Sequence, residues 1–421
     1  MLIHLANADA RVMGTAIFCI SYLVFAFGHI PGTKIDRTAM AVIGATLMVL
    51  LGILAPAEAL AAIDFPTLVL LFGMMLLAGG LEEAGFFSWL TEHVIAHVEP
   101  KHLLPAVLFC SGILSALLVN DVVCVIMTPL VLNVSHRMRR RPLPFLLALA
   151  TASNIGSVAT IVGNPQNILI ASVSHISYLE FASRLAPIAL IGLLLDWAVL
   201  QVLFGRSLSE EIEAVPLANR CDTPVTSSQS GNDVRRMLWP LFICLMVLIS
   251  LLCGVEPAAS AAAAACLLLI SRTVEPGALL RHVNMALLVF FVGLFLVLAG
   301  GEAAGVNEKL LSVAEHMNLR HTLIFTAVVT LLSNLVSNVP AVMLLKPIVL
   351  QQGNTHAAWL LLAMASTLAG NLTITGSVAN IIVVESARKE SPVSFWQYLR
   401  VGVPVTLLTL VVGWVWLRLW R

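Results

Sequence analysis

Charged side chains are scarce in this sequence. Asp, Glu, Lys and Arg make up 11% of its 421 residues, whereas hydrophobic residues make up 59%. A soluble globular domain carries roughly 25% charged residues, so the composition excludes that class of protein. The formal net charge is zero, which removes the electrostatic case for a nucleic-acid partner.

Motifs of ATPases and common hydrolases are also missing. The sequence contains no GxxxxGK[ST] phosphate-binding loop, which leaves no case for ATP hydrolysis within this chain. It lacks HExxH and GxSxG as well, so we expect no enzyme and no catalytic residue. The seven cysteines have neither zinc-ligand nor CxxC spacing, and they are expected to be small packing residues.

Long apolar runs take the place of these motifs. Leu-, Val- and Ala-rich runs recur along the whole chain, and a helix of roughly 17–25 apolar residues crosses a bilayer. The runs do not alternate as barrel strands do, so the sequence predicts an all-α polytopic membrane protein. A polar stretch at 205–236 is predicted to be a linker between a first transmembrane repeat, 1–204, and a second, 237–421.

The two halves resemble each other, which indicates an internal duplication. Asp121 and Asn338 are separated by 217 positions, and so are Asn154 and Asn371. Three pairs of stretches match in the same order: "LLAGGLEEAGFFSWL" (76–90) with "LVLAGGEAAGVNEKL" (296–310), "LLVNDVVCVIMTPLVL" (117–132) with "NLVSNVPAVMLLKPIVL" (334–350), and "ATASNIGSVATIVGNPQNILIAS" (150–172) with "LAGNLTITGSVANIIVVES" (368–386).

The charges of matching loops differ between the halves. The loop "HRMRRR" (136–141) is basic, whereas its counterpart "QQGNTH" (351–356) has no Lys or Arg; after the next block the pattern reverses. Because basic loops face the cytoplasm, the halves are predicted to be inverted-topology repeats, as in many secondary transporters. This orientation makes 205–236 a cytoplasmic linker and places both termini outside. We expect the chain to lie among the lipids of a bacterial cytoplasmic (inner) membrane.

Four polar blocks interrupt the apolar runs. The run 102–134 is too long for one span and is broken at Asn120 and Asp121, so it is predicted to be a re-entrant hairpin, as is 321–350. Segments 143–172 and 357–384 contain Gly, Asn and, in the first, Pro, and they are predicted to be broken helices. This division leaves about ten transmembrane helices.

Broken helices at membrane depth suit a binding site, because irregular backbone survives there only where protein or a cavity satisfies its polar groups. Half-helix N-termini favour an anion, and unwound carbonyls favour Na⁺, the only cofactor expected. Asp121 is an ionisable group at membrane depth and hence a candidate coupling residue. The predicted substrate-binding residues are Asn120, Ser337, Asn338, Asn154, Gly156, Ser157, Asn371, Thr375, Gly376 and Ser377. The predicted coupling-ion residues are Asp121, Asn164, Asn167 and Asn380.

The stretches "NDVVCVIMTPLVL", "SNVPAVMLL", "SNIGSVATIVGNPQNILIA" and "GNLTITGSVANIIVVESA" resemble the ion-transporter superfamily with the citrate-transporter-like domain. That group includes bacterial anion permeases, arsenite permeases, sodium–proton antiporters and divalent-anion/sodium symporters. The resemblance implies two repeats with substrate and cation at the hairpin tips and broken helices, and often a homodimer.

These features predict a secondary active transporter of a small anion or oxyacid, of the dicarboxylate or inorganic oxyanion class. Alternating access would couple its transport to a proton or sodium gradient. One alternative is an arsenite/antimonite efflux permease, which takes a neutral ligand and would be the only case for a separate ATPase subunit. A second is a sodium–proton antiporter centred on Asp121, and an anion channel is a third.

Overall fold

The computed structural model describes residues 7–30, 32–209, 233–271, 274–352 and 355–419. These residues form α-helices and short 3₁₀ turns, and no strand. In chain order the elements are α1 (Asn7–Phe27), α2 (Arg37–Leu50), α3 (Pro56–Ala62), α4 (Phe65–Glu83), α5 (Phe86–His97), η1 (Pro100–His102), α6 (Leu103–Leu117), α7 (Asn120–Arg137), α8 (Leu143–Ser157), η2 (Ile161–Gly163), α9 (Pro165–Ser174), α10 (Tyr178–Ser209), α11 (Asp233–Leu252), α12 (Pro257–Ile270), α13 (Pro276–Arg281), α14 (Met285–Ala303), α15 (Val306–His316), α16 (Thr322–Val336), α17 (Asn338–Leu350), α18 (Thr355–Ala369), η4 (Ile374–Gly376), α19 (Val378–Ala387) and α20 (Phe395–Leu419).

The predicted all-α polytopic class is confirmed. Within the described ranges, six helices are long and apolar enough to cross a membrane: α1, α4, the η1–α6 helix, α10, α14 and α20. Eight further apolar segments are shorter, with 10–17 residues each: α2, α8, the part Arg236–Leu252 of α11, α12, α16, α17, α18 and α19. The short helices include the four that flank the second predicted hairpin tip and the second helix break, α16, α17, α18 and α19. The opposite membrane orientation of the two halves stays a prediction.

Each of two long apolar runs of the sequence, 38–60 and 66–94, forms two helices rather than one. The run 38–60 becomes α2 and α3, because α3 starts afresh with Pro56 in its first turn. The run 66–94 becomes α4 and α5, which are separated by Gly85 with a φ of 82°, a conformation that costs glycine little. The predicted linker 205–236 is too long at both ends, because α10 continues to Ser209 and α11 begins at Asp233. Its central part, 210–232, lies outside the described residues.

Each of the two runs that are predicted to be re-entrant hairpins forms a pair of helices. In 102–134, α6 ends at Leu117 and α7 begins at Asn120. In 321–350, α16 gives way to α17 at Ser337, which has a φ of 77° and a ψ of 158°. Few residues other than glycine adopt that conformation, at a cost of about 1–3 kcal/mol. In 143–172 and 357–384, two helices flank an unwound turn and a 3₁₀ turn, η2 or η4.

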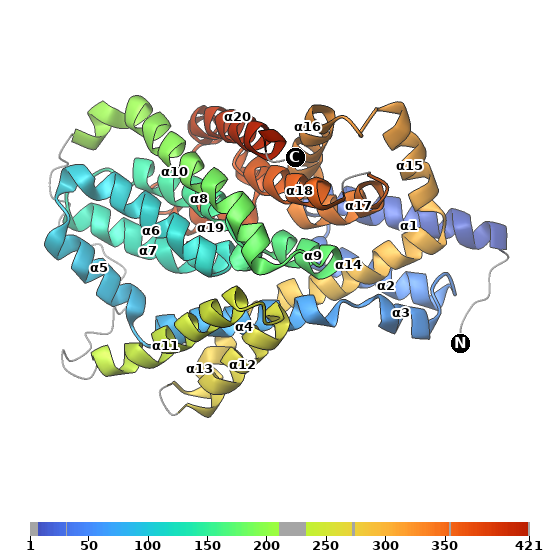
Figure 1. The fold of residues 1–421 in the computed structure, drawn as a ribbon, viewed down its shortest axis with the longest axis horizontal. Coiled ribbons are helices and arrows are strands. Elements are labelled where there is room, and N and C mark those ends of the chain that lie inside the picture. The colour runs from blue at the N-terminus through green and yellow to red at the C-terminus, as the bar shows by residue number, and fades with distance from the viewer. Residues whose placement is uncertain (1–6, 31, 210–232, 272–273, 353–354, 420–421) are drawn as a thin grey trace.

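Helices from opposite halves pack against each other in two equivalent pairs. Figure 1 shows α4 beside α12, and α14 beside α2. A Cβ atom on Gly73 of α4 would lie 2.5 Å from the backbone oxygen of Ala261 in α12, and one on Gly293 of α14 would lie 2.6 Å from the backbone carbon of Ala41 in α2. In both contacts a glycine lets the helices approach closely. The duplication inferred from the sequence is therefore visible as a repeated helix contact.

The residues that correspond between the two halves differ from the pairs that the 217-residue offset predicts. The second helix of each pair begins at Asn120 and at Asn338, so Asn338 matches Asn120, and Asp121 matches Val339. The offset was wrong because it took the Asn of "SNV" to match the Asp of "VND". Asn154 lies within α8, whereas Asn371 follows the end of α18, so these two residues are not equivalents either.

A histidine just outside the spans ties α13 to the end of α4. His282 Nδ1 lies 3.0 Å from Glu82 Oε2, and Nε2 lies 2.8 Å from Glu83 Oε1. The two carboxylates, Glu82 first, raise the pKa of His282 to about 9 although partial burial opposes this. The ordinary pKa of about 6.5 applies in the unfolded chain, so the stabilisation is complete below that pH and is lost as the pH rises through about 9.

We therefore predict that His282→Gln lowers the thermal midpoint of the purified protein at pH ~6 but not at pH ~10. The half-buried site limits the effect to about 1 kcal/mol or less. His316→Gln is the control, because within the described structure the hydrogen bond of His316 is to the carbonyl oxygen of Ser312 in its own helix and not to a carboxylate. A loss of equal size at both pH values would contradict the assignment.

Candidate functional site

A cavity of about 190 Å³ lies where the helix pairs and the broken helices meet. Five of the predicted site residues line it: Asn120, Asp121, Ser337, Asn338 and Ser377. The other lining residues come from α2, the start of α9, the α13–α14 loop, α14, α17 and the start of α19: Arg37, Thr38, Pro165, Gln166, Asn284, Ala286, Leu287, Phe290, Val339, Pro340 and Val378. The cavity thus brings together segments from both halves of the chain.

The four helices that follow the predicted hairpin tips and helix breaks all begin at this cavity. Their first residues are Asn120 (α7), Pro165 (α9), Asn338 (α17) and Val378 (α19), and all four line it. A helix N-terminus carries a partial positive charge and backbone N–H groups without helical partners. Four of them around one small cavity create a site that is electrostatically suited to an anion.

Two charged residues of opposite sign line the same cavity. Asp121 lies in the first turn of α7, and its carboxylate faces the backbone N–H of Ala379 in α19. Arg37 lies at the start of α2, and its Nε is buried without a hydrogen-bond partner in the part of the chain that the structure describes. No ion pair between Arg37 and Asp121 is present within the described structure. Arg37 thus adds a fixed positive charge at the cavity and an unused donor beside it.

Asn154, which is fully buried, joins the parts of the site behind the cavity. Its Oδ1 accepts hydrogen bonds from Asn120 Nδ2 (3.1 Å) and Ser377 Oγ (2.9 Å). Its Nδ2 donates to Asn371 Oδ1 and Asn380 Oδ1, both at 2.9 Å. One amide therefore connects a helix tip of the first half with the helix break of the second half.

Asn167 and Asn380 occupy equivalent places in the two helix breaks. Asn167 Nδ2 donates to the carbonyl oxygens of Ser157 and Thr160, both at 3.0 Å. Asn380 Nδ2 donates to those of Gly370 (2.7 Å) and Thr373 (3.1 Å). Each asparagine satisfies backbone carbonyls that the break releases from the helical pattern.

Asn164 and Ser157 form the rest of the first break. Asn164 Oδ1 accepts from the backbone N–H of Asn167 and so caps α9. Its Nδ2 donates to Ser157 Oγ (3.0 Å) and to Thr367 Oγ1 (3.2 Å). Three of the four predicted coupling-ion residues, Asn164, Asn167 and Asn380, are thus fully buried behind the cavity, and only Asp121 reaches it. The role of all four in ion binding stays a prediction.

The structure places three other predicted binding residues away from the cavity lining. A Cβ atom on Gly156 would lie 2.0 Å from the carbonyl oxygen of Gly112, so Gly156 serves the close crossing of α8 and α6. Gly376 lies against Asn334, whose Oδ1 would be 2.6 Å from such a Cβ. Thr375 is exposed, and its Oγ1 lies 3.3 Å from Thr373 Oγ1.

Three polar residues of this region are not among the predicted site residues. Arg37 borders an apolar run, where a basic residue usually marks only the end of a span. Gln166 is part of "GNPQN", and its Nε2 donates to Thr367 Oγ1 at 3.2 Å. Asp196 lies in the middle of an apolar run and is fully buried. The criterion that singled out Asp121, an ionisable group at membrane depth, applies equally to Asp196.

The helical fold and its buried polar centre are those of a polytopic membrane transporter. The solved structure of the YdaH transporter of Alcanivorax borkumensis shares the fold, with a TM-score of 0.55 over 98% of each chain at 15% identity. The family model described as "Citrate transporter" matches residues 22–369. The chain belongs to this family, and the predicted membership of the ion-transporter superfamily is confirmed.

Curated relatives extend over nearly the whole chain. A silicon efflux transporter, LSI3, from Oryza sativa subsp. japonica is 31% identical, with 97% of this chain and 98% of the relative covered. A putative transporter, arsB, from Dictyostelium discoideum is 26% identical, with 97% and 92% covered. The family and these relatives are membrane transporters rather than enzymes, and the chain is accordingly an integral membrane transporter.

The role of Asn154 can be tested by unfolding. We expect Asn154→Ala to lower the thermal midpoint strongly, because it leaves buried polar groups of four residues without a partner, at roughly 1–3 kcal/mol for each group. Ser135→Ala is the matched control, since Ser135 is equally buried but donates only to Val131 O within its own helix. Similar midpoints for the two variants would show that the network around Asn154 does not hold the centre together.

Proposed function

We propose that this protein is a secondary active transporter of a small anion or oxyacid, of the dicarboxylate or inorganic oxyanion class. Transport is coupled to a proton or sodium gradient and proceeds by alternating access across the cytoplasmic membrane of a bacterium. The transporter class follows from the family; the substrate, the coupling and the bacterial membrane are the proposal.

The convergence of four helix N-termini on one cavity carries this proposal. The ends of α7, α9, α17 and α19 favour negative charge at their common focus. Arg37 adds a guanidinium group, whose donors match the oxygens of a carboxylate, sulfate or phosphate. The size of the cavity favours a small ligand. Its volume of about 190 Å³ is smaller than the roughly 300–1,000 Å³ of pockets that hold drug-sized ligands.

The position of the cavity supports alternating access. Arg37, Thr38 and Phe290 line it from α2 and α14, and residues of the helix tips and breaks form much of the rest of its lining. α2 and α14 are packed together through Gly293. If the helix tips and breaks moved relative to this pair, a ligand in the cavity would be exposed first to one side of the membrane and then to the other.

A second candidate function is efflux of an uncharged oxyacid. The names of the relatives favour it, since one is a silicon efflux transporter and another is called arsB. Arsenite or antimonite would then be the ligand, and a separate ATPase subunit would be a partner to search for. Asn120, Ser337 and Ser377 offer the neutral hydrogen-bonding groups that such a ligand needs. A homodimer stays a prediction under either function.

A thermal-stability panel on the purified protein tests the proposal. Sulfate, phosphate, succinate, citrate, arsenite, antimonite and silicic acid would each be added with Na⁺ or at varied pH. A ligand at ~100 times its dissociation constant stabilises by roughly 2.7 kcal/mol. We predict a shift with at least one anion.

We expect Arg37→Gln to weaken this binding about tenfold or more, because a hydrogen bond to a charged group contributes roughly 1.5–3 kcal/mol. Arg281→Gln is the control, since Arg281 ends α13 and does not line the cavity. A shift only with uncharged oxyacids, unaffected by Arg37→Gln, would favour the efflux permease. A shift with Na⁺ or pH alone would favour the sodium–proton antiporter.

A further inference from the structure

A second buried carboxyl group lies outside the cavity. Asp196, on α10, has 0% of its surface exposed, and its Oδ1 has no hydrogen-bond partner among the described residues. Its Oδ2 lies 2.7 Å from Thr151 Oγ1 on α8. Gly192, one turn earlier on the same face, lies against Ile155 of α8 and Thr409 of α20. Asp196 thus faces the junction of α8, α10 and α20 in the interior.

The contacts of Thr151 bear on the protonation of Asp196. Thr151 Oγ1 has a single proton but lies within 2.8 Å of Leu147 O and 2.7 Å of Asp196 Oδ2. Both neighbours are acceptors if Asp196 is ionised, and one proton serves only one of them well. If Asp196 carries a proton, its Oδ2–H donates to Thr151 Oγ1, and the Thr151 hydroxyl donates to Leu147 O. Protonation therefore satisfies both short contacts.

The surroundings of Asp196 provide no opposite charge. Within the described residues no ion pair involves Asp196, and α8 and η2, which pack against α10, contain no titratable residue. On α20, Tyr398 is buried and close enough to interact electrostatically with Asp196. The remaining titratable side chains described on the elements packed against α10 are Cys110 (α6), Cys244 and Arg236 (α11), His356 (α18), and Arg400 and Arg418 (α20).

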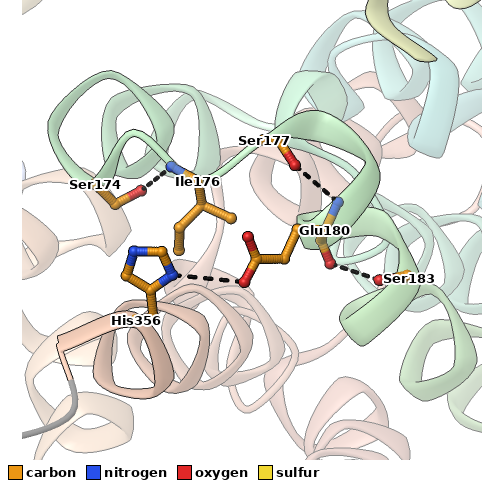
Figure 2. A network of polar contacts seen from close by, with 6 residues as sticks. All are labelled: Ser174, Ile176, Ser177, Glu180, Ser183 and His356. Carbon is orange, nitrogen blue, oxygen red and sulfur yellow. Dashed lines mark hydrogen bonds and ion pairs between the residues drawn. The ribbon is translucent and has the colours of Figure 1, made fainter. Parts of the chain in front are cut away.

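These charged groups lie elsewhere. Arg236, Arg400 and Arg418 are exposed, and His356 Nδ1 lies 3.5 Å from Glu180 Oε1 at the start of α10, as Figure 2 shows. An unpaired buried carboxylate costs several kcal/mol, so a bound proton is the simplest way to neutralise Asp196.

Hydrogen bonds connect this acid to the cavity. The carbonyl oxygen of Thr151 accepts from Asn371 Nδ2 at 3.1 Å, and Asn371 Oδ1 accepts from Asn154 Nδ2 at 2.9 Å. Asn154 then bonds Asn120 and Ser377, both of which line the cavity. A change at Thr151 is therefore three hydrogen bonds away from the groups that would contact a ligand.

We propose that Asp196 is a proton-binding residue, and that the proton it carries is the ion coupled to transport. The proposal rests on the function proposed above. That function allows either a proton or sodium as the coupling ion, and the present proposal selects the proton. In the loaded state Asp196 Oδ2–H donates to Thr151 Oγ1. On release the proton passes from Oδ2 to water admitted to the junction of α8, α10 and α20 in the other access state, and the Thr151 hydroxyl turns from Leu147 O to the carboxylate. Thr151 acts as a positioning residue that relays this change to Asn371.

Infrared spectroscopy of the full-length protein in lipid tests proton binding directly. We expect a carbonyl-stretch band of a protonated carboxylic acid that decreases as the pH is raised. Asp196→Asn should abolish this band, while Asp121→Asn and Glu256→Gln should leave it in place. Thr151→Val should shift its frequency and its titration midpoint, and Thr151→Ser should restore both. A spectrum that Asp196→Asn leaves unchanged at every pH, or an Asp196 band that never titrates, would overturn the proposal.

Flux measurements test the coupling. Vesicles containing a pH-sensitive dye would receive a gradient of sulfate, succinate or arsenite, and we expect wild-type protein to move protons with the substrate. Asp196→Asn should lose this proton movement while a measurable exchange of labelled for unlabelled substrate continues; Glu256→Gln should behave as wild type. Proton movement that persists in Asp196→Asn refutes the coupling role. If wild-type vesicles move none of the solutes, the proposed transport function fails, and the infrared titration still decides whether Asp196 exchanges a proton.

Discussion

Side-chain amides that replace lost backbone hydrogen bonds hold the centre of this protein together. A break in a helix releases carbonyl and N–H groups, and in an apolar interior these groups need partners from the protein. Asn167 and Asn380 provide them in the first and second break. Because the breaks are held in this way, α9 and α19 can begin beside the cavity, and the tips of α7 and α17 meet them there.

The same requirement explains why the centre is rich in asparagine and poor in charge. An asparagine offers two donors and an acceptor without the cost of burying an ion. Asn154 uses both functions to link the two halves. Among the described residues of the centre, the acidic and basic side chains are Arg37 and Asp121 at the cavity and Asp196 behind it. A small number of ionisable groups in such a setting gives each one a large effect on the energy of a bound ligand.

The sequence was sufficient to predict the class, the duplication and the four irregular blocks, because Gly, Pro and Asn within apolar runs have few structural explanations. It also predicted Asn120, Asp121, Ser337, Asn338 and Ser377 at one site, and the structure brings them to one cavity. It could not distinguish residues that face a ligand from those that satisfy the backbone, since both are asparagines or small polar residues. Asn167 and Asn380 belong to the second group in geometry. Arg37 could not be predicted for another reason. Its position at the cavity depends on the packing of α2 against distant parts of the chain, which no local sequence pattern encodes.

The exchange of helix partners between the halves has a consequence for biosynthesis. The glycine face of α4 is filled by α12, and α2 fills that of α14. A chain that is made from its N-terminus must therefore insert α2 and α4 well before the helices that complete their packing exist. The first half therefore cannot complete its helix packing before the second half is synthesised. It has to stay in the bilayer as a partly assembled intermediate until the helices of the second half are inserted beside it.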